Sequence, residues 1–323
     1  MEEKEKNFVV GVDVGGQTTK IGVVDTRGEV LTQSVIRTDT YGTDADAYIS
    51  TLADAITKVV EAAGKVGEIR GVGVGAPNGN YYTGCIAFAP NLAWAANGSV
   101  EFAKILSEKL GGIPVSLTND ANAAAVGEMA YGVARGMKNF IMITLGTGVG
   151  SGIVINGQVV YGHDGFAGEL GHTCVVRNNG RTCNCGKQGC LEAYCSAIGV
   201  AKTAQEWLSA GDEPSKLREC DTISSKDVYD AAKDGDKMAL RIFDFTGRIL
   251  GEKLADFIEF SAPEAIVLFG GLARSKEFLT EPILKAMNEN VLPLWRDKVK
   301  LVYSQLKESD AAILGASALA WEL

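Results

Sequence analysis

FVVGVDVGGQTTKIGVVD, residues 8–25, contains two Val-rich apolar stretches joined by a polar turn with two adjacent glycines. Short apolar runs separated by a glycine turn are typical of a β-hairpin, and Thr26-Arg27-Gly28 then turns the chain into a third strand over 29–36. The stretch therefore predicts a three-stranded β-meander. Apolar residues at helical spacing over 45–64, and an apolar run over 69–74, predict a helix and a further strand.

The same order of elements recurs in FIMITLGTGVGSGIVI, residues 140–155, and Asn156-Gly157 is a pair preferred by the type I′ turn of a hairpin. This repetition predicts two similar α/β domains that face each other across a cleft, each offering a glycine hairpin to a shared ligand. We expect one domain over 1–118, completed by a C-terminal helix at about 305–323, and a larger one over 119–304. The remaining periodicity predicts helices over 226–234, 237–260 and 276–290 and a strand over 265–269.

Bulk composition narrows the class of protein. A chain of 323 residues has room for two domains, and its net charge of −9 disfavours nucleic acid or an anionic membrane as a partner. The charged residues 1–7 lack the apolar core of a signal peptide, and no apolar run reaches the ~18 residues of a membrane span. We therefore expect a cytoplasmic enzyme with no nucleic-acid and no membrane partner.

Each glycine hairpin has the chemistry of a phosphate-binding loop. Glycines let consecutive backbone N–H groups approach an anion, hydroxyls and a lysine add donors, and an aspartate can hold a hydrated Mg²⁺. The alternative is an ordinary tight hairpin, and the presence of two such turns favours nucleotide binding. The candidate residues are Asp13, Gly15, Gly16, Thr18, Thr19 and Lys20 in the first hairpin and Gly146, Thr147 and Gly148 in the second.

A candidate catalytic base lies in LTNDANAAAVGE, residues 117–128, where a short strand runs into an Ala-rich helix. Asn119, Asp120 or Asn122 could simply cap this helix. However, a hydroxyl that accepts a phosphoryl group needs a carboxylate to orient it and take its proton. We expect Asp120 to be that base.

Three cysteines and a histidine have the character of a metal site. Cys183, Cys185 and Cys190 fall within eight residues, and His172 is the nearer of the two histidines in the chain, the other being His163. Three thiolates and one imidazole form the closed tetrahedral set of structural zinc, so we expect Zn²⁺ with an architectural role. The alternative is a group of unconnected cysteines. The other four, Cys85, Cys174, Cys195 and Cys220, are expected to behave as small apolar residues.

Two further features are less specific. Glu169 and Glu192 bracket the cysteine loop and could accept hydrogen bonds from sugar hydroxyls, although isolated glutamates are more often solvated surface groups. Gly270-Gly271 ends an apolar strand and would let an adenine or ribose lie against the backbone. A plain strand-to-helix turn is the alternative for these two glycines.

Taken together, these motifs resemble the ROK family (repressor, open reading frame, kinase) and, within it, the bacterial glucokinases. The resemblance runs from Asp13-Val-Gly-Gly through Asn119-Asp120 and Gly168-Glu-Leu-Gly-His172 to CNCGKQGCLE, residues 183–192. It implies a two-domain actin-like ATPase fold of the ribonuclease H type, ATP in the cleft and a homodimer.

The resemblance also implies roles for single residues. Asp120 matches the catalytic base of the family, and the implied sugar contacts are Asn119, Glu169, His172 and Glu192 beside Asp120 itself. The implied zinc ligands are His172, Cys183, Cys185 and Cys190. The chain departs from the family pattern at Gln17, where threonine is commoner, and at Asn78, where glycine is commoner.

These patterns predict transfer of the ATP γ-phosphoryl group to the 6-hydroxyl of glucose. N-acetylglucosamine, N-acetylmannosamine, mannose and allose are alternative acceptors, because single groups distinguish them. A sugar-responsive repressor is disfavoured because no helix-turn-helix precedes the first strand, and a noncatalytic zinc module would not need Asp13 and Asp120.

Overall fold

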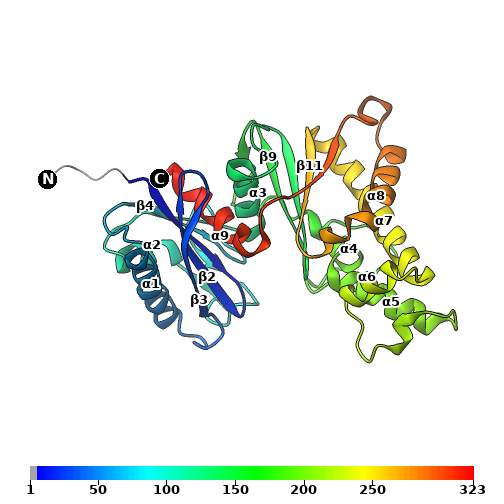
Figure 1. The fold of residues 1–323 in the computed structure, drawn as a ribbon, viewed down its shortest axis with the longest axis horizontal. Helices are drawn as coiled ribbons and strands as arrows, with labels where there is room; N and C mark the ends of the chain where they lie inside the picture. Colours follow the sequence, from blue (N-terminus) through cyan, green and yellow to red (C-terminus); the bar gives the residue numbers. More distant parts are fainter. Residues whose placement is uncertain (1–5) are drawn as a thin grey trace. The chain divides into compact units, whose positions relative to one another are not determined.

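The computed structural model describes residues 6–323, shown in Figure 1. Contacts group the chain into two compact units. Unit 1 comprises the chain up to Met137 together with Gly152–Gly168 and Gln305–Leu323, and unit 2 comprises Lys138–Ser151 and Glu169–Ser304. The segment 119–137 is thus grouped with unit 1. The division into domains over 1–118 and 119–304 stays a prediction.

The sheet of unit 1 has five strands in the order β3-β2-β1-β4-β7. They are β1 (Phe8–Val14), β2 (Thr18–Asp25), β3 (Val30–Arg37), β4 (Ile69–Gly75) and β7 (Val115–Thr118). The first three pair antiparallel, as the predicted meander requires, and β1, β4 and β7 run parallel. Because carboxyl ends of parallel strands meet at one edge, the residues after β1, β4 and β7 are brought together.

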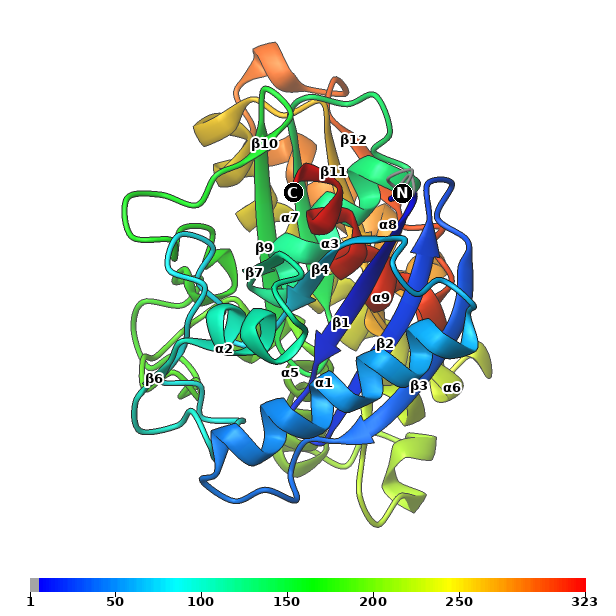
Figure 2. The same ribbon diagram turned by 90° about the vertical axis from the view of Figure 1, so that its left-hand side faces the viewer.

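Helices cover both faces of this sheet. Figure 2 shows α1 crossing one face of the strands, with α9 behind them. Val10 and Val12 share a buried core with α1, whereas Gly11 faces α9 so closely that a Cβ there would lie 2.1 Å from the Ile313 carbonyl oxygen. Alternate residues of β1 thus pack against helices on opposite faces of the sheet. The helices are α1 (Ala45–Ala62), α2 (Phe102–Lys109), α3 (Asp120–Tyr131) and α9 (Glu308–Leu319), and β5 (Ile86–Ala87) pairs with β6 (Ser99–Val100).

A second five-stranded sheet has the order β10-β9-β8-β11-β12. Its strands are β8 (Phe140–Leu145), β9 (Val149–Ile155), β10 (Gln158–Val159), β11 (Ala265–Phe269) and β12 (Lys300–Tyr303). Asn156 and Gly157 have φ values of +53° and +77°, which confirms the predicted type I′ turn between β9 and β10. β11 pairs parallel with both β8 and β12, so Gly270-Gly271 follows a buried strand as expected.

The helices of unit 2 bury the apolar side chains of β8 and β11 in one core. They are α4 (Glu192–Cys195), α5 (Ala197–Ala210), α6 (Ser225–Lys233), α7 (Lys237–Ser261) and α8 (Lys276–Asn290). In Figure 1, α7 lies against α8, and Gly251 lets the Ile283 carbonyl approach to 2.4 Å of where a Cβ would stand. None of the helices within residues 6–323 has the length and apolar character to cross a membrane.

Candidate active site and metal centre

The carboxyl edge of the unit 1 sheet places two aspartates near each other. Asp13 pairs with Lys20 on one side and Gly75 on the other, and Gly75 pairs in turn with Thr118. Asp120 starts α3 two residues after Thr118, and a Cβ on Gly75 would lie 3.6 Å from the Asp120 Cα. Parallel pairing, rather than sequence proximity, therefore brings Asp13 and Asp120 together.

Asn119, not Asp120, is the N-cap of α3. The Asn119 Oδ1 accepts hydrogen bonds from the backbone amides of Ala121 at 2.8 Å and Asn122 at 3.3 Å. One oxygen of Asp120 also accepts from Ala121 at 2.8 Å. The cap thus occupies the Asn119 oxygen, and of that side chain the amide nitrogen is the group suited to a ligand.

Burial raises the pKa of both carboxyl groups, and at Asp13 repulsion from Asp120 adds to this effect. Desolvation, followed by repulsion from Asp120, raises the pKa of Asp13 to about 6, while Lys20 acts in the opposite sense. Asp120 has access to solvent, yet desolvation by the surrounding protein raises the pKa of its carboxyl group, opposed by the Ala121 amide. A raised pKa suits a group that must take a proton near neutral pH, and the pair has the negative character that a divalent cation relieves.

Hydrogen bonds to neighbouring backbone and side-chain groups hold the first glycine hairpin in place. The amide of Gly15 donates to the Thr18 carbonyl at 3.0 Å and that of Thr38 to the Gln17 carbonyl at 2.8 Å. Thr19 is fully buried, and its hydroxyl lies 2.8 Å from that of Thr38 and 2.6 Å from that of Tyr48. The Thr19 hydroxyl thus braces the hairpin, whereas Gly16, Thr18 and Lys20 keep partial exposure.

The second glycine hairpin borders a pocket within unit 2. The amide of Gly146 donates to the Gly148 carbonyl at 3.0 Å, and Thr147 at the tip is exposed. Thr147 also lines a cavity of about 440 Å³ together with Ile198, Lys202 and Ser224. This combination of backbone amides, a hydroxyl, a cation and an exposed apolar side chain fits a nucleotide.

Gly270 and Gly271 differ in what they tolerate. Gly270 has φ of +103°, and a Cβ there would lie 2.6 Å from the Leu145 carbonyl oxygen, so the turn itself requires glycine. Apart from its chain neighbours, no atom of the described residues 6–323 lies within 4 Å of a Cβ built on Gly271. Of this pair, Gly271 is therefore the one with open space for a ligand.

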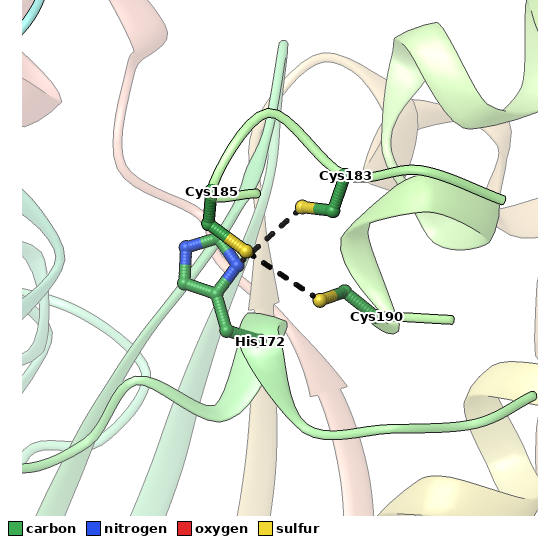
Figure 3. Close-up of side chains that lie close together, drawn as sticks. All are labelled: His172, Cys183, Cys185 and Cys190. Carbon is green, nitrogen blue, oxygen red and sulfur yellow. Dashed lines mark hydrogen bonds between the residues drawn. The ribbon is translucent and has the colours of Figure 1, made fainter. Parts of the chain in front are cut away.

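His172, Cys183, Cys185 and Cys190 come together in unit 2, as Figure 3 shows. One ligand atom from each lies within 4.8 Å of the others. The Cys183 Sγ is 3.7 Å from the His172 Nδ1, and the sulfurs of Cys185 and Cys190 are 3.6 Å apart. All seven cysteines are free thiols.

These spacings fit zinc. Tetrahedral ligands at the bond lengths of zinc–thiolate and zinc–imidazole bonds lie roughly 3.3–3.8 Å from one another. Desolvation raises the pKa of Cys183 to about 12, whereas at Cys185 the Lys187 amide and neighbouring thiols outweigh desolvation and lower the pKa. Zinc binds thiolates, so metal binding there would release protons.

The two glutamates that bracket the cysteine loop have different surroundings. Glu169 is exposed, with one carboxylate oxygen 3.9 Å from the His172 Nε2. Glu192 is half-buried, accepts a hydrogen bond from the Val149 amide at 3.0 Å, and its other oxygen lies 3.4 Å from the Cys183 Sγ. Glu192 therefore links the metal cluster to the second glycine hairpin.

The structure indicates a role for Arg181 that its position in the sequence did not suggest. Arg181, nearly buried in the cysteine loop, pairs with Glu206, donates to the carbonyls of Ala193 and Gly199, and lies over the Tyr194 ring. These contacts of Arg181 could not be predicted from the sequence, because the partner residues lie 12 to 25 positions further along the chain.

Asn78, noted as a departure from the family pattern, has φ of +52°, a conformation that favours glycine or asparagine. Its amide donates to the carbonyls of Ala87 and Phe88 at 3.1 and 2.9 Å. Asparagine at position 78 thus adopts the left-handed backbone conformation that glycine also favours. In addition, its side chain holds the backbone of Ala87 and Phe88.

The raised pKa of Asp13 predicts a stability change. The Asp13 carboxyl group stays protonated up to about pH 6 in the folded state, but in the unfolded state it loses its proton near pH 3.8. The free energy of unfolding therefore falls as the pH rises between these two values, and it stays lower at higher pH. Asp13→Asn should raise the free energy of unfolding at pH 7.5 by ~1–3 kcal/mol, a gain that vanishes below pH ~4.

Denaturant unfolding measures this change in the free energy of unfolding. Asp25→Asn is a comparison variant for which we expect a change of the opposite sign. Despite desolvation, hydrogen bonds from Glu29 and Arg27 lower the pKa of Asp25, so its replacement should destabilise the protein at neutral pH and less in acid. An Asp13→Asn protein that is less stable than the unmodified chain at pH 7.5 would contradict the assigned environment.

Comparison with known proteins reveals full-length relatives. Residues 9–322 match the sequence profile of the ROK family. A glucokinase from Halalkalibacterium halodurans is 38% identical over 315 residues, which cover 95% of this chain and 93% of the relative. A xylose repressor from Caldicellulosiruptor bescii is 27% identical, and the match covers 98% of this chain and 78% of the repressor.

The crystal structure of a ROK family glucokinase from Streptomyces griseus in complex with glucose and AMPPNP is similar to this chain, with a TM-score of 0.79 and 31% identity. The match covers 98% of this chain and 100% of that one. The expected actin-like ATPase fold is thereby confirmed.

Proposed function

Because the chain belongs to the ROK family, we propose that it is an ATP-dependent hexose kinase that phosphorylates the 6-hydroxyl of glucose. The observation that carries the proposal is the Asp120 carboxyl group, which has solvent access, a raised pKa and a second carboxylate, Asp13, beside it. A repressor that only binds sugar has no need of such a pair.

Asp120 acts as the general base. It accepts the proton of the sugar 6-hydroxyl as the oxygen–phosphorus bond forms and the bond from the γ-phosphorus to the leaving ADP oxygen breaks. The Ala121 amide, which donates to one Asp120 oxygen at 2.8 Å, fixes the carboxylate and leaves its other oxygen for the sugar. Orientation by the start of α3 thus supplies part of the rate enhancement.

The phosphate groups are held by the two glycine hairpins. Backbone amides around Gly15–Gly16 and Gly146–Gly148, with Thr18, Lys20 and Thr147, neutralise charge as it shifts toward the leaving ADP. Asp13 would hold Mg²⁺ through water, and that ion would supply further neutralisation. The cavity beside Thr147 takes the adenosine, with Gly271 as an open backbone contact.

The metal loop organises sugar contacts. Zn²⁺ on His172 Nδ1 and the three thiolates would fix the imidazole and leave its Nε2 for a hydroxyl. Glu169 and Glu192 flank the same loop, and the family pattern implies Asn119 as a further sugar contact. These groups recognise the hydroxyls of a hexose. We also propose a cytoplasmic homodimer, in keeping with free thiols and the family.

The test uses an acceptor that lacks the reacting oxygen. ADP release, followed by a coupled assay, should depend on glucose, whereas 6-deoxyglucose should support no release and should compete with glucose. N-acetylglucosamine, N-acetylmannosamine, mannose and allose, assayed in parallel, identify the preferred hexose. Equal ADP release with 6-deoxyglucose, or none with any hexose, would refute the assignment.

A further inference from the structure

Glu192 lies between two sites that the proposed function treats separately. One carboxylate oxygen accepts the Val149 amide of the second glycine hairpin at 3.0 Å, and the other lies 3.4 Å from the Cys183 sulfur. A Cβ on Gly148 would fall 2.4 Å from the same Glu192 oxygen that Val149 binds. The contact thus requires glycine at 148 and an acceptor oxygen on the side chain at 192.

We propose that Glu192 is a positioning residue that couples the metal loop to the nucleotide hairpin, so that zinc on the loop increases the affinity for ATP. This inference rests on the proposed function, because it takes the second hairpin as a nucleotide site. Zinc would fix Cys183 and Cys190, Cys190 precedes Glu192 by two residues, and the Glu192 carboxylate accepts the Val149 amide.

The loop has a second attachment that keeps it folded when metal is absent. Arg181 bonds Glu206 at 2.6 Å and the carbonyl oxygens of Ala193 and Gly199 at 3.0 and 3.2 Å. Lys187 donates to the His172 carbonyl at 2.9 Å. Metal removal is therefore expected to loosen the position of Glu192 rather than to unfold unit 2.

Binding of a non-hydrolysable ATP analogue, measured by calorimetry in magnesium buffer without sugar, tests the coupling. We expect zinc removal to raise the Kd of the analogue about tenfold in the unmodified chain, because a charge-assisted hydrogen bond has that strength. By linkage, saturating analogue should tighten zinc binding by the same factor.

Variants assign this effect to Glu192. Gly148→Ala and Glu192→Ala should abolish the zinc dependence of the nucleotide Kd, whereas Glu192→Gln, which keeps an acceptor for Val149, should retain it. Gly211→Ala is the matched control, because its added Cβ meets no atom within 4 Å and Gly211 lies outside both sites. Amide exchange at Val149 gives an independent readout and should accelerate on zinc removal in the unmodified chain.

The outcomes separate this inference from the function on which it rests. An equal nucleotide Kd with and without zinc would overturn the coupling and leave the kinase assignment intact. A zinc dependence that persists in both Gly148→Ala and Glu192→Ala would overturn the role of Glu192. Absence of nucleotide binding by the zinc-loaded chain would overturn the proposed function and the inference together.

Discussion

Asp120→Asn should lower kcat by about 10²–10⁴-fold, the contribution typical of a general base. The amide keeps an oxygen for the Ala121 N–H, so the start of α3 stays intact, but it cannot take the proton of the sugar hydroxyl. Glucose binding, measured by calorimetry, should therefore change little. In the unmodified enzyme, kcat should fall as pH drops through the raised pKa of Asp120.

The control for this change is Asp44→Asn. Asp44 caps α1, also in unit 1, and accepts the Ala47 amide at 3.0 Å, so the same exchange of carboxylate for amide occurs at a helix start far along the chain from Asp120. Asp44→Asn should retain kcat. Near-normal turnover of the Asp120→Asn variant would exclude Asp120 as the general base.

Cys183→Ser removes one of the four proposed zinc ligands and should abolish stoichiometric zinc binding. Mass spectrometry of metals should find one zinc per unmodified chain and a large loss in the variant. Since a metal that binds only the folded state at 1,000 times its Kd contributes about 4 kcal/mol, the melting temperature should fall as well. Glucose affinity should drop, because His172 and the flanking glutamates lose their common support.

Cys220→Ser is the matched control for the metal. Cys220 is a free thiol of the same unit outside the four-residue cluster. Its replacement should leave the zinc content at one per chain. Full zinc retention in Cys183→Ser, or equal loss in Cys220→Ser, would contradict the assigned ligand set.

Features with strong local signals were predictable from sequence. The meander over residues 8–37 follows from apolar runs and glycine turns, and the Asn156-Gly157 turn has the left-handed backbone that this pair favours. The metal cluster was also predictable, because Cys183, Cys185 and Cys190 lie so close in sequence that few arrangements separate them.

Features that depend on tertiary contacts were not. The link from Glu192 to Val149 joins residues 43 positions apart. Thr19 has the residue type of a phosphate donor, yet strand alternation turns its hydroxyl into the core toward Thr38 and Tyr48. Helix α5 was also not predicted; it contains Gly199, where a Cβ would lie 2.7 Å from Tyr194 backbone, so packing rather than helix propensity selects that residue.

The most direct test of the central claim is identification of the product by ³¹P NMR after incubation of the zinc-loaded protein with ATP, Mg²⁺ and glucose. The expected products are glucose 6-phosphate and ADP in equal amounts. ADP with free phosphate and no sugar phosphate, or no consumption of ATP with any hexose, would rule out the proposed hexose kinase activity.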